Sequence, residues 1–293
     1  GRGIMRISIF GGTGFVGSHL IHALVKSGHS VRLLSRNPAT HHDLLTFPSV
    51  QLQSIPNWQS SELAEAIQSS DVSINLIGIL NEKGFNGEGF YKAHVETTKA
   101  ITQACRLAQV NRYLHMSALN AGEGFSHYLK SKGEAEDIVM RAEQEFGLLT
   151  TIFQPSVIFG RGDSFINRFA SLLALSPVLP LARPHARFQP VWVNDVAKAL
   201  VTVLDKPSSY GQRYPLVGPD TYSLIKIVKI IANHMHKKRL IIPLPGVVSY
   251  IQAQIMDLVP GKPYSTDNDR SLLLDSISSV DGLKQLGIKS QSL

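Results

Sequence analysis

The feature that most constrains this chain is a glycine-rich turn between an apolar run and a helical pattern near its start. The stretch "IFGGTGFVGSHL" places Gly11, Gly14 and Gly17 three residues apart, with Gly12 as an additional glycine. The first glycine permits a tight turn off a strand, the second a close approach of ligand to backbone, and the third close packing of helix on sheet. The spacing therefore predicts the first strand, turn and helix of a parallel α/β sheet.

Apolar runs and helical patterns alternate along the first half of the chain, which supports the same fold class. We expect strands at residues 6–10, 30–34, 50–55, 72–79, 112–117 and 149–154. Strands that alternate with helices form right-handed βαβ units in a mostly parallel sheet. The sequence therefore predicts an α/β protein with a Rossmann-type doubly wound parallel sheet, a fold that contains six such strands.

The pattern becomes looser after Pro155, which predicts a division into two parts. Residues 5–154 are expected to form a dinucleotide-binding Rossmann domain, and residues 155–293 a smaller substrate-side lobe. A strand and a helix near residues 187–205 are expected to return to the main domain. A chain of 293 residues has the length for one such domain with an interleaved lobe.

In this context the glycine-rich turn predicts binding of a dinucleotide. The helix that follows it would offer unpaired N–H groups and a positive dipole end to a pyrophosphate. The candidate contacts are Gly11, Thr13, Gly14, Phe15, Val16 and Gly17. A glycine-rich turn without a ligand is the alternative interpretation.

The end of the second predicted strand bears on which dinucleotide binds. An NAD site usually has an acidic residue there for the ribose hydroxyls, whereas this chain has Ser35 and Arg36, and its first carboxylate after them is Asp43. A guanidinium pairs with a 2′-phosphate that a carboxylate would repel. The sequence therefore favours NADP(H) over NAD(H). In the alternative interpretation Arg36 stacks on the adenine or faces solvent.

Two tyrosine–lysine pairs with a spacing of four residues occur in the chain, Tyr128 with Lys132 and Tyr222 with Lys226. The first pair opens the helix after the fifth predicted strand, close to where parallel strands hold ligands at their carboxyl ends. Ser117 ends that strand, so we expect a hydroxyl, a phenol and an ammonium group at one edge of the sheet. The second pair lies in the smaller lobe, and we expect it to have no role in catalysis.

This set of residues resembles that of the short-chain dehydrogenase/reductase superfamily, and the resemblance covers nearly the whole chain. It implies an NAD(P)-dependent oxidoreductase or epimerase in which Tyr128 is the acid/base group. Lys132 would stabilise the phenolate and bind the nicotinamide ribose, and Ser117 would orient the substrate oxygen. A phenol has a pKa of about 10, so it needs such a cation to act near neutral pH.

The second half carries a narrower resemblance, in "YLKSKGEAE", "QPSVIFGRGDSFINRFA", "QPVWVNDVAKAL" and "PLPGVVSYIQAQIMDLVPGKPYSTDND". These segments resemble NAD-dependent epimerase/dehydratase-like proteins, in the branch that contains the NADPH-binding accessory subunit of respiratory complex I and its bacterial relatives. The resemblance implies that the nicotinamide lies beside Gln154, Pro155, Ser156 and Val157. It also implies that Arg161 and Asp163 lie near the mouth of the substrate site.

The chain departs from the superfamily at three places. Asn57 stands where an acidic residue often lies near the adenine, and His94 stands where an asparagine often shapes the active site. After the fourth predicted strand, "NLIGIL" replaces a turn of small residues. Leu76 and Ile77 would then form an apolar floor for the cofactor, with Gly78 beside them. These differences bear on turnover more than on cofactor binding.

Composition argues against several other classes of protein. The single cysteine, Cys105, excludes an internal disulfide and indicates a reducing, cytoplasmic compartment. The histidines in "HH" and "HMH" lack the partners and the spacing of a metal site, so no metal is expected. The net charge of +7 includes no basic block longer than "HKKR", so nucleic acid is not an expected partner. Residues 1–4, "GRGI", do not resemble a targeting peptide, and no transmembrane helix is expected.

Residues 246–259 carry an apolar stripe at helical spacing that has two interpretations. The stripe consists of Val247, Val248, Ile251, Ile255, Leu258 and Val259. Such a stripe usually packs on the core of the protein. The alternative is a helix that docks on a protein partner or at the periphery of a membrane, and the preceding "HKKR" would suit an anionic surface.

Two functions remain open from the sequence. The first is an NADP(H)-dependent oxidoreductase or epimerase that acts on a carbonyl or hydroxyl group of an unidentified small molecule. The second is a non-catalytic NADP(H)-binding protein that stabilises or assembles a membrane-associated system related to respiratory complex I or to quinones. The sequence identifies neither the substrate nor the oligomeric state.

Overall fold

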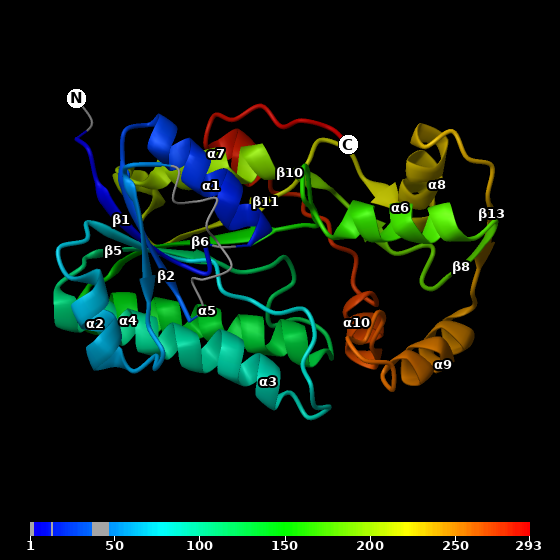
Figure 1. Cartoon of the computed structure of the whole chain (residues 1–293), viewed down its shortest axis with the longest axis horizontal. Coiled ribbons are helices and arrows are strands. Elements are labelled where there is room, and N and C mark those ends of the chain that lie inside the picture. The colour runs from blue at the N-terminus through cyan, green and yellow to red at the C-terminus, as the bar shows by residue number, and fades with distance from the viewer. Residues whose placement is uncertain (1–2, 13, 37–46) are drawn as a thin grey trace.

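The computed structural model describes residues 3–12, 14–36 and 47–293, and a parallel β-sheet forms its centre (Figure 1). The sheet has seven strands in the order β11-β6-β5-β4-β1-β2-β3, and every neighbouring pair is parallel. Its strands are β1 (Arg6–Phe10), β2 (Ser30–Ser35), β3 (Val50–Ser54), β4 (Val72–Asn75), β5 (Arg112–Met116), β6 (Leu149–Pro155) and β11 (Gln212–Leu216). The predicted fold class is confirmed, because the strand order reverses between β1 and β4 as in a doubly wound sheet.

All six predicted strands are present, and the structure corrects the end of the fourth one. β4 ends at Asn75, whereas the prediction extends to residue 79. The side-chain carbonyl of Asn75 accepts a hydrogen bond from the N–H of Ile77 at 3.0 Å, which turns the chain out of the sheet. The seventh strand, β11, lies outside the prediction, since its sequence "QRYPL" does not read as a strand.

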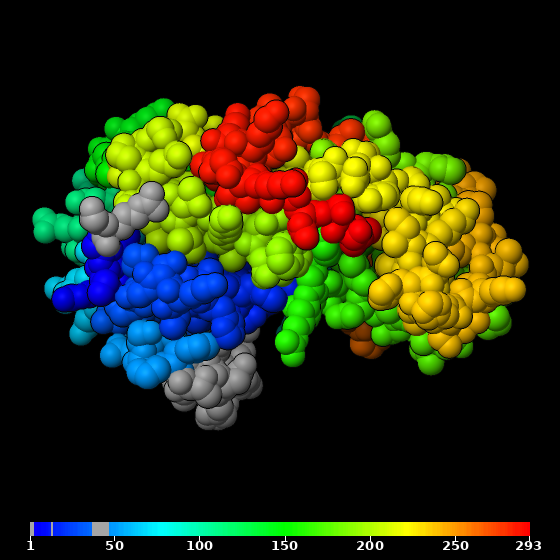
Figure 2. Space-filling view, turned by 90° about the horizontal axis from the view of Figure 1, so that it is seen from above, coloured from blue at the N-terminus to red at the C-terminus, as the bar shows by residue number. Residues whose placement is uncertain are grey.

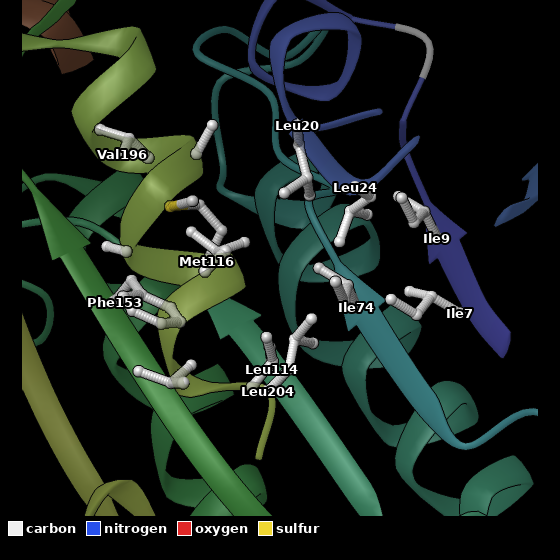
Figure 3. Close-up of a cluster of buried hydrophobic side chains, with 14 of the residues drawn as sticks. Ile7, Ile9, Leu20, Leu24, Ile74, Leu114, Met116, Phe153, Val196 and Leu204 are labelled. Carbon is white, nitrogen blue, oxygen red and sulfur yellow. The ribbon is translucent and has the colours of Figure 1, made fainter. Parts of the chain in front are cut away.

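Helices cover both faces of the sheet (Figure 1). α1 (Phe15–Lys26) and α7 (Val193–Val203) lie on one face, and α2 (Ser60–Ile67), α4 (Thr97–Ala108) and α5 (His127–Phe146) lie on the other. Figure 3 shows the first core, where Leu20 and Leu24 of α1 lie over Ile74 of β4. Val196 of α7 and Leu114 of β5 belong to the same cluster. All five side chains are buried. Burial of these aliphatic groups stabilises the position of α1, and so the position of the turn before it.

The helix that leads into α4 begins irregularly. α3 (Glu88–Phe90) passes into a π-helical segment, η3 (Tyr91–Glu96), and α4 continues from it. A single π-helical turn widens a helix locally and is frequent at functional sites. Here it contains His94, whose side chain is buried.

A smaller lobe lies beside the main domain, on the right in Figure 1. Its helices and main strands are α6 (Phe165–Leu175), β8 (Val178–Leu181), α8 (Leu224–His234), β13 (Leu240–Pro243), α9 (Gly246–Met256) and α10 (Thr266–Ser271). Three two-stranded pairs complete the strands: β7 (Ile158–Phe159) with β10 (Val191–Trp192), β9 (Arg187–Phe188) with β12 (Tyr222–Ser223), and β8 with β13. The lobe has its own core, in which Leu173, Leu179 and Ile227 are buried.

Later parts of the chain return to the main domain. β11 follows the short helix η4 (Pro207–Ser209) and pairs with β6, and α11 (Gly282–Gln285) packs on β11. The C-terminal segment then crosses to the smaller lobe, as the red atoms in Figure 2 show. Leu283 and Ile288 belong to the first core, and Leu293 packs on the core of the lobe. The two parts of the molecule are therefore interleaved in sequence.

Candidate functional site

The three glycines of the turn after β1 lie in different surroundings. Gly11 has a φ of +77°, and a Cβ there would meet Ile77 at 2.9 Å. A Cβ on Gly17 would lie 2.1 Å from the carbonyl oxygen of Gly12, so only glycine lets α1 approach the turn this closely. Among the described residues a Cβ on Gly14 would meet nothing within 4 Å, so they leave open space in front of that residue. These surroundings suit a turn that receives a ligand at Gly14.

The N-terminus of α1 begins at this open space, directly after Gly14. Gly14 is the N-cap residue and provides no side-chain hydrogen bond, and the first turn carries no acidic residue. The N–H groups of Phe15, Val16 and Gly17 therefore have no intrahelical acceptor. A bound anion would be stabilised by these donors and by the helix dipole. Thr13, also expected at this site, lies outside the described residues.

The end of β2 places Arg36 over an aromatic ring. Its guanidinium carbon lies 5.0 Å from the centre of the Trp58 ring, and the side chain is exposed. The indole of Trp58 is held by a hydrogen bond to the carbonyl of Ile55 at 2.9 Å and by an edge contact with Phe10. The guanidinium is thus supported on a fixed ring beside Ser35 at the carboxyl edge of the sheet. Asp43 lies outside the described residues.

The segment after β4 forms a floor between the glycine turn and α5. The N–H of Leu76 donates to the carbonyl of Phe10 at 2.9 Å, and Ile77 contacts the position of a Cβ on Gly11. Gly78 lies against Lys132, since a Cβ there would be 3.0 Å from the lysine Nζ. The floor therefore connects the expected pyrophosphate site with the tyrosine–lysine pair.

Tyr128 and Lys132 lie one turn apart on the inner side of α5. The helix begins after Ser126, whose hydroxyl accepts a hydrogen bond from the N–H of Leu129 at 3.1 Å. Lys132 is buried, and its Nζ lies 5.9 Å from the centre of the half-buried Tyr128 ring. The structure thus brings together the phenol and the ammonium group that the sequence pairs.

Burial affects the pKa values of both groups in the direction of their neutral forms. Burial raises the pKa of Tyr128 to about 12. Burial lowers the pKa of Lys132 to about 8, against the opposing effect of the negative charge on Glu136. In this structure Tyr128 is therefore a protonated phenol, which can donate a proton, at neutral pH.

The hydroxyl of Ser117 lies just beyond β5 and is engaged with a buried carboxylate. It donates to Glu136 at 2.5 Å, and the same carboxylate accepts two hydrogen bonds of 3.1 Å from the amide of Gln154. Arg213 of β11 completes the set with an ion pair of 2.8 Å. Sequence reasoning missed Glu136, although it follows Lys132 by the same four residues that separate Lys132 from Tyr128.

His94 lies behind the floor and Tyr128. Its Nε2 accepts a hydrogen bond from the N–H of Ile79 at 3.0 Å, so its Nδ1 carries the proton and donates to Ser131 at 2.7 Å. The hydroxyl of Ser131 donates in turn to the carbonyl of Tyr128. Burial, assisted by the charge of Lys132, lowers the pKa of His94 to about 2. The ring therefore stays neutral and links the floor to α5.

The residues expected beside the nicotinamide mark the junction of the two parts. The hydroxyl of Ser156 donates to the carbonyl of Ser276 at 2.8 Å, and the carbonyl of Pro155 accepts from the N–H of Leu119 at 3.2 Å. Val157, which follows, packs partly on the core of the smaller lobe. The end of β6 thus joins the loop after β5 to the C-terminal lobe.

The "GRGD" turn has a structural explanation for its acidic residue. Asp163 is buried and accepts hydrogen bonds from the N–H groups of Gly160 and Ile166 at 2.9 and 2.8 Å, which fixes the start of α6. Arg161 is exposed, and its carbonyl contacts the ring of His19 at 2.8 Å. The carboxylate of Asp163 therefore stabilises the backbone of this turn.

A carboxylate from the smaller lobe caps α5 at the site itself. Asp267 of α10 accepts hydrogen bonds from the N–H groups of His127 and Tyr128 at 2.7 and 3.1 Å. Asn268 donates to the carbonyl of Leu80, so α10 contacts the floor segment as well. Sequence reasoning missed this contact, because no short-range pattern connects residues that lie about 140 positions apart.

The second tyrosine–lysine pair lies apart from this arrangement. Tyr222 belongs to β12, where its hydroxyl contacts Asp220 at 3.4 Å, and Lys226 is exposed on α8. Within the described residues, no group of three histidine, cysteine, aspartate or glutamate side chains could hold a metal ion. In the same part of the chain, no helix has both the length and the apolar character to cross a membrane.

Comparison with known proteins gives consistent matches. The model of the NAD dependent epimerase/dehydratase family matches residues 7–216. Subunit 9 of the NADH dehydrogenase [ubiquinone] 1 alpha subcomplex of Mus musculus is 32% identical over 98% of this chain and 77% of its own length. A ceramide reductase of Caulobacter vibrioides is 30% identical over 85% of this chain and 76% of its own length.

Solved structures agree with the fold. The dTDP-glucose 4,6-dehydratase DesIV of Streptomyces venezuelae, solved with NAD and TYD bound, superposes with a TM-score of 0.78. The match covers 99% of this chain and 93% of that one, at 18% sequence identity. At this identity the likeness establishes the shared fold.

Proposed function

The chain belongs to the NAD dependent epimerase/dehydratase family, and on that premise we propose that it is an NADP(H)-dependent oxidoreductase or epimerase. Tyr128 would be its acid/base group and a carbonyl or hydroxyl group its target. The observation that supports this most is the position of Tyr128 and Lys132 on one side of α5, with the ammonium group against Gly78. Among the described residues the Lys132 ammonium forms no hydrogen bond or ion pair, and a buried lysine of this kind beside a phenol is typical of a functional site.

The residues present fit a dinucleotide. The open space at Gly14, the uncapped start of α1 and the missing side chain at Gly78 together leave room for a ligand along the carboxyl edge of the sheet. The turn and the first turn of α1 would hold the pyrophosphate, and Lys132 would bind the ribose beside Gly78. When bound, the reduced nicotinamide supplies a hydride.

The chain's own groups would supply the proton. Because the pKa of Tyr128 is raised to about 12, the phenol is protonated at neutral pH and can donate to the oxygen of a substrate carbonyl. The nearby ammonium of Lys132 would stabilise the phenolate that results. Ser117 donates its own hydrogen to Glu136, so its oxygen lone pairs remain available to accept a hydrogen bond from a substrate hydroxyl.

The test of this proposal compares two tyrosine variants. Tyr128→Phe is expected to lower the turnover of NADPH with a responsive carbonyl substrate by about 10²- to 10⁴-fold, the usual size of an acid–base contribution. The dissociation constant for NADPH should change less than about twofold, because the phenol makes no contact with the pyrophosphate region. The matched control is Tyr222→Phe, from the other tyrosine–lysine pair, which should behave as the wild type.

The screen should include quinones, small ketones and long-chain carbonyl compounds, since one relative is named a ceramide reductase. Gly14→Val provides the reference for lost binding. Its side chain would enter space that the described residues leave open, so we expect a folded variant without measurable affinity for NADPH. Full activity in Tyr128→Phe would contradict the proposed role of the phenol.

The preference for NADP(H) belongs to the same proposal and rests on Arg36. Its guanidinium, supported by Trp58, would pair with the 2′-phosphate. Arg36→Glu should weaken NADPH binding by about 10- to 150-fold, as expected for the loss of a charge-assisted hydrogen bond. NADH binding should change little, and isothermal titration of both nucleotides measures the difference. Equal losses for the two nucleotides would show that Arg36 does not select the phosphate.

One observation favours a second candidate function. In the catalytic hypothesis the Ser117 hydroxyl contacts the substrate, but this hydroxyl already forms a short hydrogen bond to the buried carboxylate of Glu136. The protein would then hold NADP(H) as a structural group and stabilise or assemble a membrane-associated complex, in line with the relatives named as subunits of NADH dehydrogenase. In that case NADP(H) should remain bound through purification, and no substrate should change the oxidation state of its nicotinamide.

A further inference from the structure

A helix on the surface of a protein usually turns its apolar side toward the core, but α9 turns its large apolar side chains outward. The residues that face the lobe are small, and Ser249 and Ala253 are both 0% exposed. The Ser249 hydroxyl accepts a hydrogen bond from the N–H of Arg183, so the inner side of the helix is satisfied without large apolar groups. On the outer side, Val247 and Ile255 are 74% and 60% exposed. The apolar stripe in this segment therefore does not pack on the core.

The outward stripe is not an isolated feature of this helix. It continues past the helix in Leu258, which is 82% exposed, and none of the residues from Gly246 to Met256 is charged. We call the exposed stripe residues the α9 face: Val247, Val248, Ile251, Ile255, Leu258 and Val259. Large exposed apolar patches on a folded protein mark contact surfaces rather than ordinary solvent-facing surface.

The strands next to α9 expose apolar side chains too. β13 runs directly into α9 and pairs with β8, so that Leu240 lies beside Val178 and Ile242 beside Pro180. These four side chains face solvent, while Leu179 and Leu181, the alternate residues of β8, are buried. Figure 1 shows β8, β13 and α9 at the outer end of the smaller lobe, far from the central sheet. One end of the molecule thus presents apolar groups from a helix and a two-stranded sheet.

The net positive charge of the chain lies in its second half, which carries this surface. Residues 1–154 contain 13 lysines and arginines and 13 aspartates and glutamates, whereas residues 155–293 contain 16 basic residues and nine acidic ones. Lys237 and Lys238 are exposed immediately before β13. Within the described part of the chain, neither forms an ion pair with a carboxylate. The surface is therefore apolar with unpaired cations at its edge.

This combination matches the chemistry of an anionic lipid surface. Aliphatic side chains enter the boundary between headgroups and acyl chains, and lysines at the edge pair with the negative headgroups. We propose that the protein docks on an anionic membrane surface through the α9 face and the adjoining strands.

The first test measures binding to vesicles. Wild-type protein should float with vesicles made of equal parts of phosphatidylcholine and phosphatidylglycerol, and binding should weaken with salt and be much lower on phosphatidylcholine alone. The double variant Ile251→Ser, Ile255→Ser should lower the partition coefficient at least about tenfold, since two exposed isoleucines no longer enter the lipid. The matched control is Leu107→Ser, Val280→Ser, which removes exposed apolar groups elsewhere and should bind as the wild type does.

The charge is tested separately. Lys237→Glu, Lys238→Glu should lower binding to the anionic vesicles by about tenfold or more, at about 1 kcal/mol for each lysine near the surface. Lys284→Glu, Lys289→Glu makes the same change in net charge at exposed positions away from the α9 face and should have a small effect. All four variants should keep the wild-type circular dichroism and NADPH affinity, because each changes exposed side chains only.

Three results would overturn the proposal. The first is wild-type protein that does not bind the anionic vesicles. This result would overturn the proposal even if the protein binds to other proteins. The second is equal binding by the wild type and the Ile251→Ser, Ile255→Ser variant. The third is a dimer in sedimentation equilibrium that this variant abolishes while vesicle binding is absent, which would assign the α9 face to a second copy of the chain. None of these results depends on whether Tyr128 is catalytic.

Discussion

At the scale of single residues, two buried histidines near the site predict that acid destabilises the protein. His115 lies on β5, where its Nδ1 contacts the hydroxyl of Tyr113 at 2.8 Å and its Nε2 has no hydrogen-bond partner among the residues that the structure describes. Burial, with a contribution from the charge of Lys132, lowers the pKa of His115 to about 3. His94 is affected in the same way. Both rings are therefore neutral in the folded protein but take up protons in the unfolded chain below a pH of about 6.5.

The expected consequence is a loss of stability in acid. Between pH 6.5 and 3 the unfolded chain binds more protons at His115 than the folded protein does, so the free energy of unfolding falls as the pH falls. Between pH 7 and pH 5 this amounts to about 2 kcal/mol for His115. In His115→Gln, urea denaturation should show a loss over this range that is smaller by about that amount.

His185→Gln, at an exposed position, is the control and should keep the wild-type dependence on pH. Because a glutamine does not reproduce the contact with Tyr113, the variant is expected to be less stable at pH 7. The comparison therefore uses the slope with pH and not the stability at one pH. An unchanged slope would mean that His115 takes up its proton over the same pH range in the folded and the unfolded protein.

At the scale of elements, α5 connects the chemistry of the site with the packing of the sheet. Tyr128, Lys132 and Glu136 follow one another at intervals of four residues on the inner side of this helix. Glu136 receives hydrogen bonds from Ser117 at the end of β5, from Gln154 of β6 and from Arg213 of β11. One buried carboxylate therefore joins α5 to three neighbouring strands of the sheet.

Glu136→Gln tests this connection. The substituted amide brings two N–H donors among groups that already donate, so we expect a cost of about 1 to 3 kcal/mol in the free energy of unfolding. The charge of Glu136 also raises the pKa of Lys132, so its removal should move any alkaline limb of the activity profile to lower pH. Asp137→Asn, exposed on the same helix, is the control. If the variant is as stable as the wild type, the attraction between Glu136 and Arg213 only balances the cost of removing the two charges from water.

At the scale of the whole molecule, the smaller lobe completes the site through α10. The carboxylate of Asp267 provides the acceptors for the first N–H groups of α5, and Lys262 donates to the carbonyl of Gly84 in the loop that follows the floor. α10 follows α9 along the chain and packs on it. The surface proposed to dock on a membrane is therefore connected, through the packing of α9 on α10, with the residues that position Tyr128.

Asp267→Ala should loosen this connection. Loss of the cap is expected to cost about 1 to 2 kcal/mol and to speed hydrogen exchange at the amides of His127 and Tyr128 by roughly tenfold. Asp281→Ala removes a similar cap from α11 and should leave those two amides unaffected. If exchange at His127 and Tyr128 stays as slow as in the wild type, another group protects the start of α5.

Local patterns in the sequence predicted much of the fold. Six strands of the central sheet, the glycine-rich turn and the tyrosine–lysine helix each depend on residues close together in the chain, where periodicity and glycine spacing report directly on structure. The sequence did not predict β11, because "QRYPL" lacks the apolar pattern of a strand and is held in the sheet by its pairing with β6. The end of β4 depends on a single side chain, Asn75, that a run of apolar residues conceals.

The sequence by itself thus determined the class of fold, the turn suited to a dinucleotide and the pairing of Tyr128 with Lys132. Only the tertiary structure decided that Ser117 donates to Glu136, that Asp267 caps α5 and that the apolar stripe of α9 faces outward. The physical reason is the same in each case. A hydrogen bond or a buried face depends on which distant element lies opposite, and that information is absent from the spacing of residues within one element.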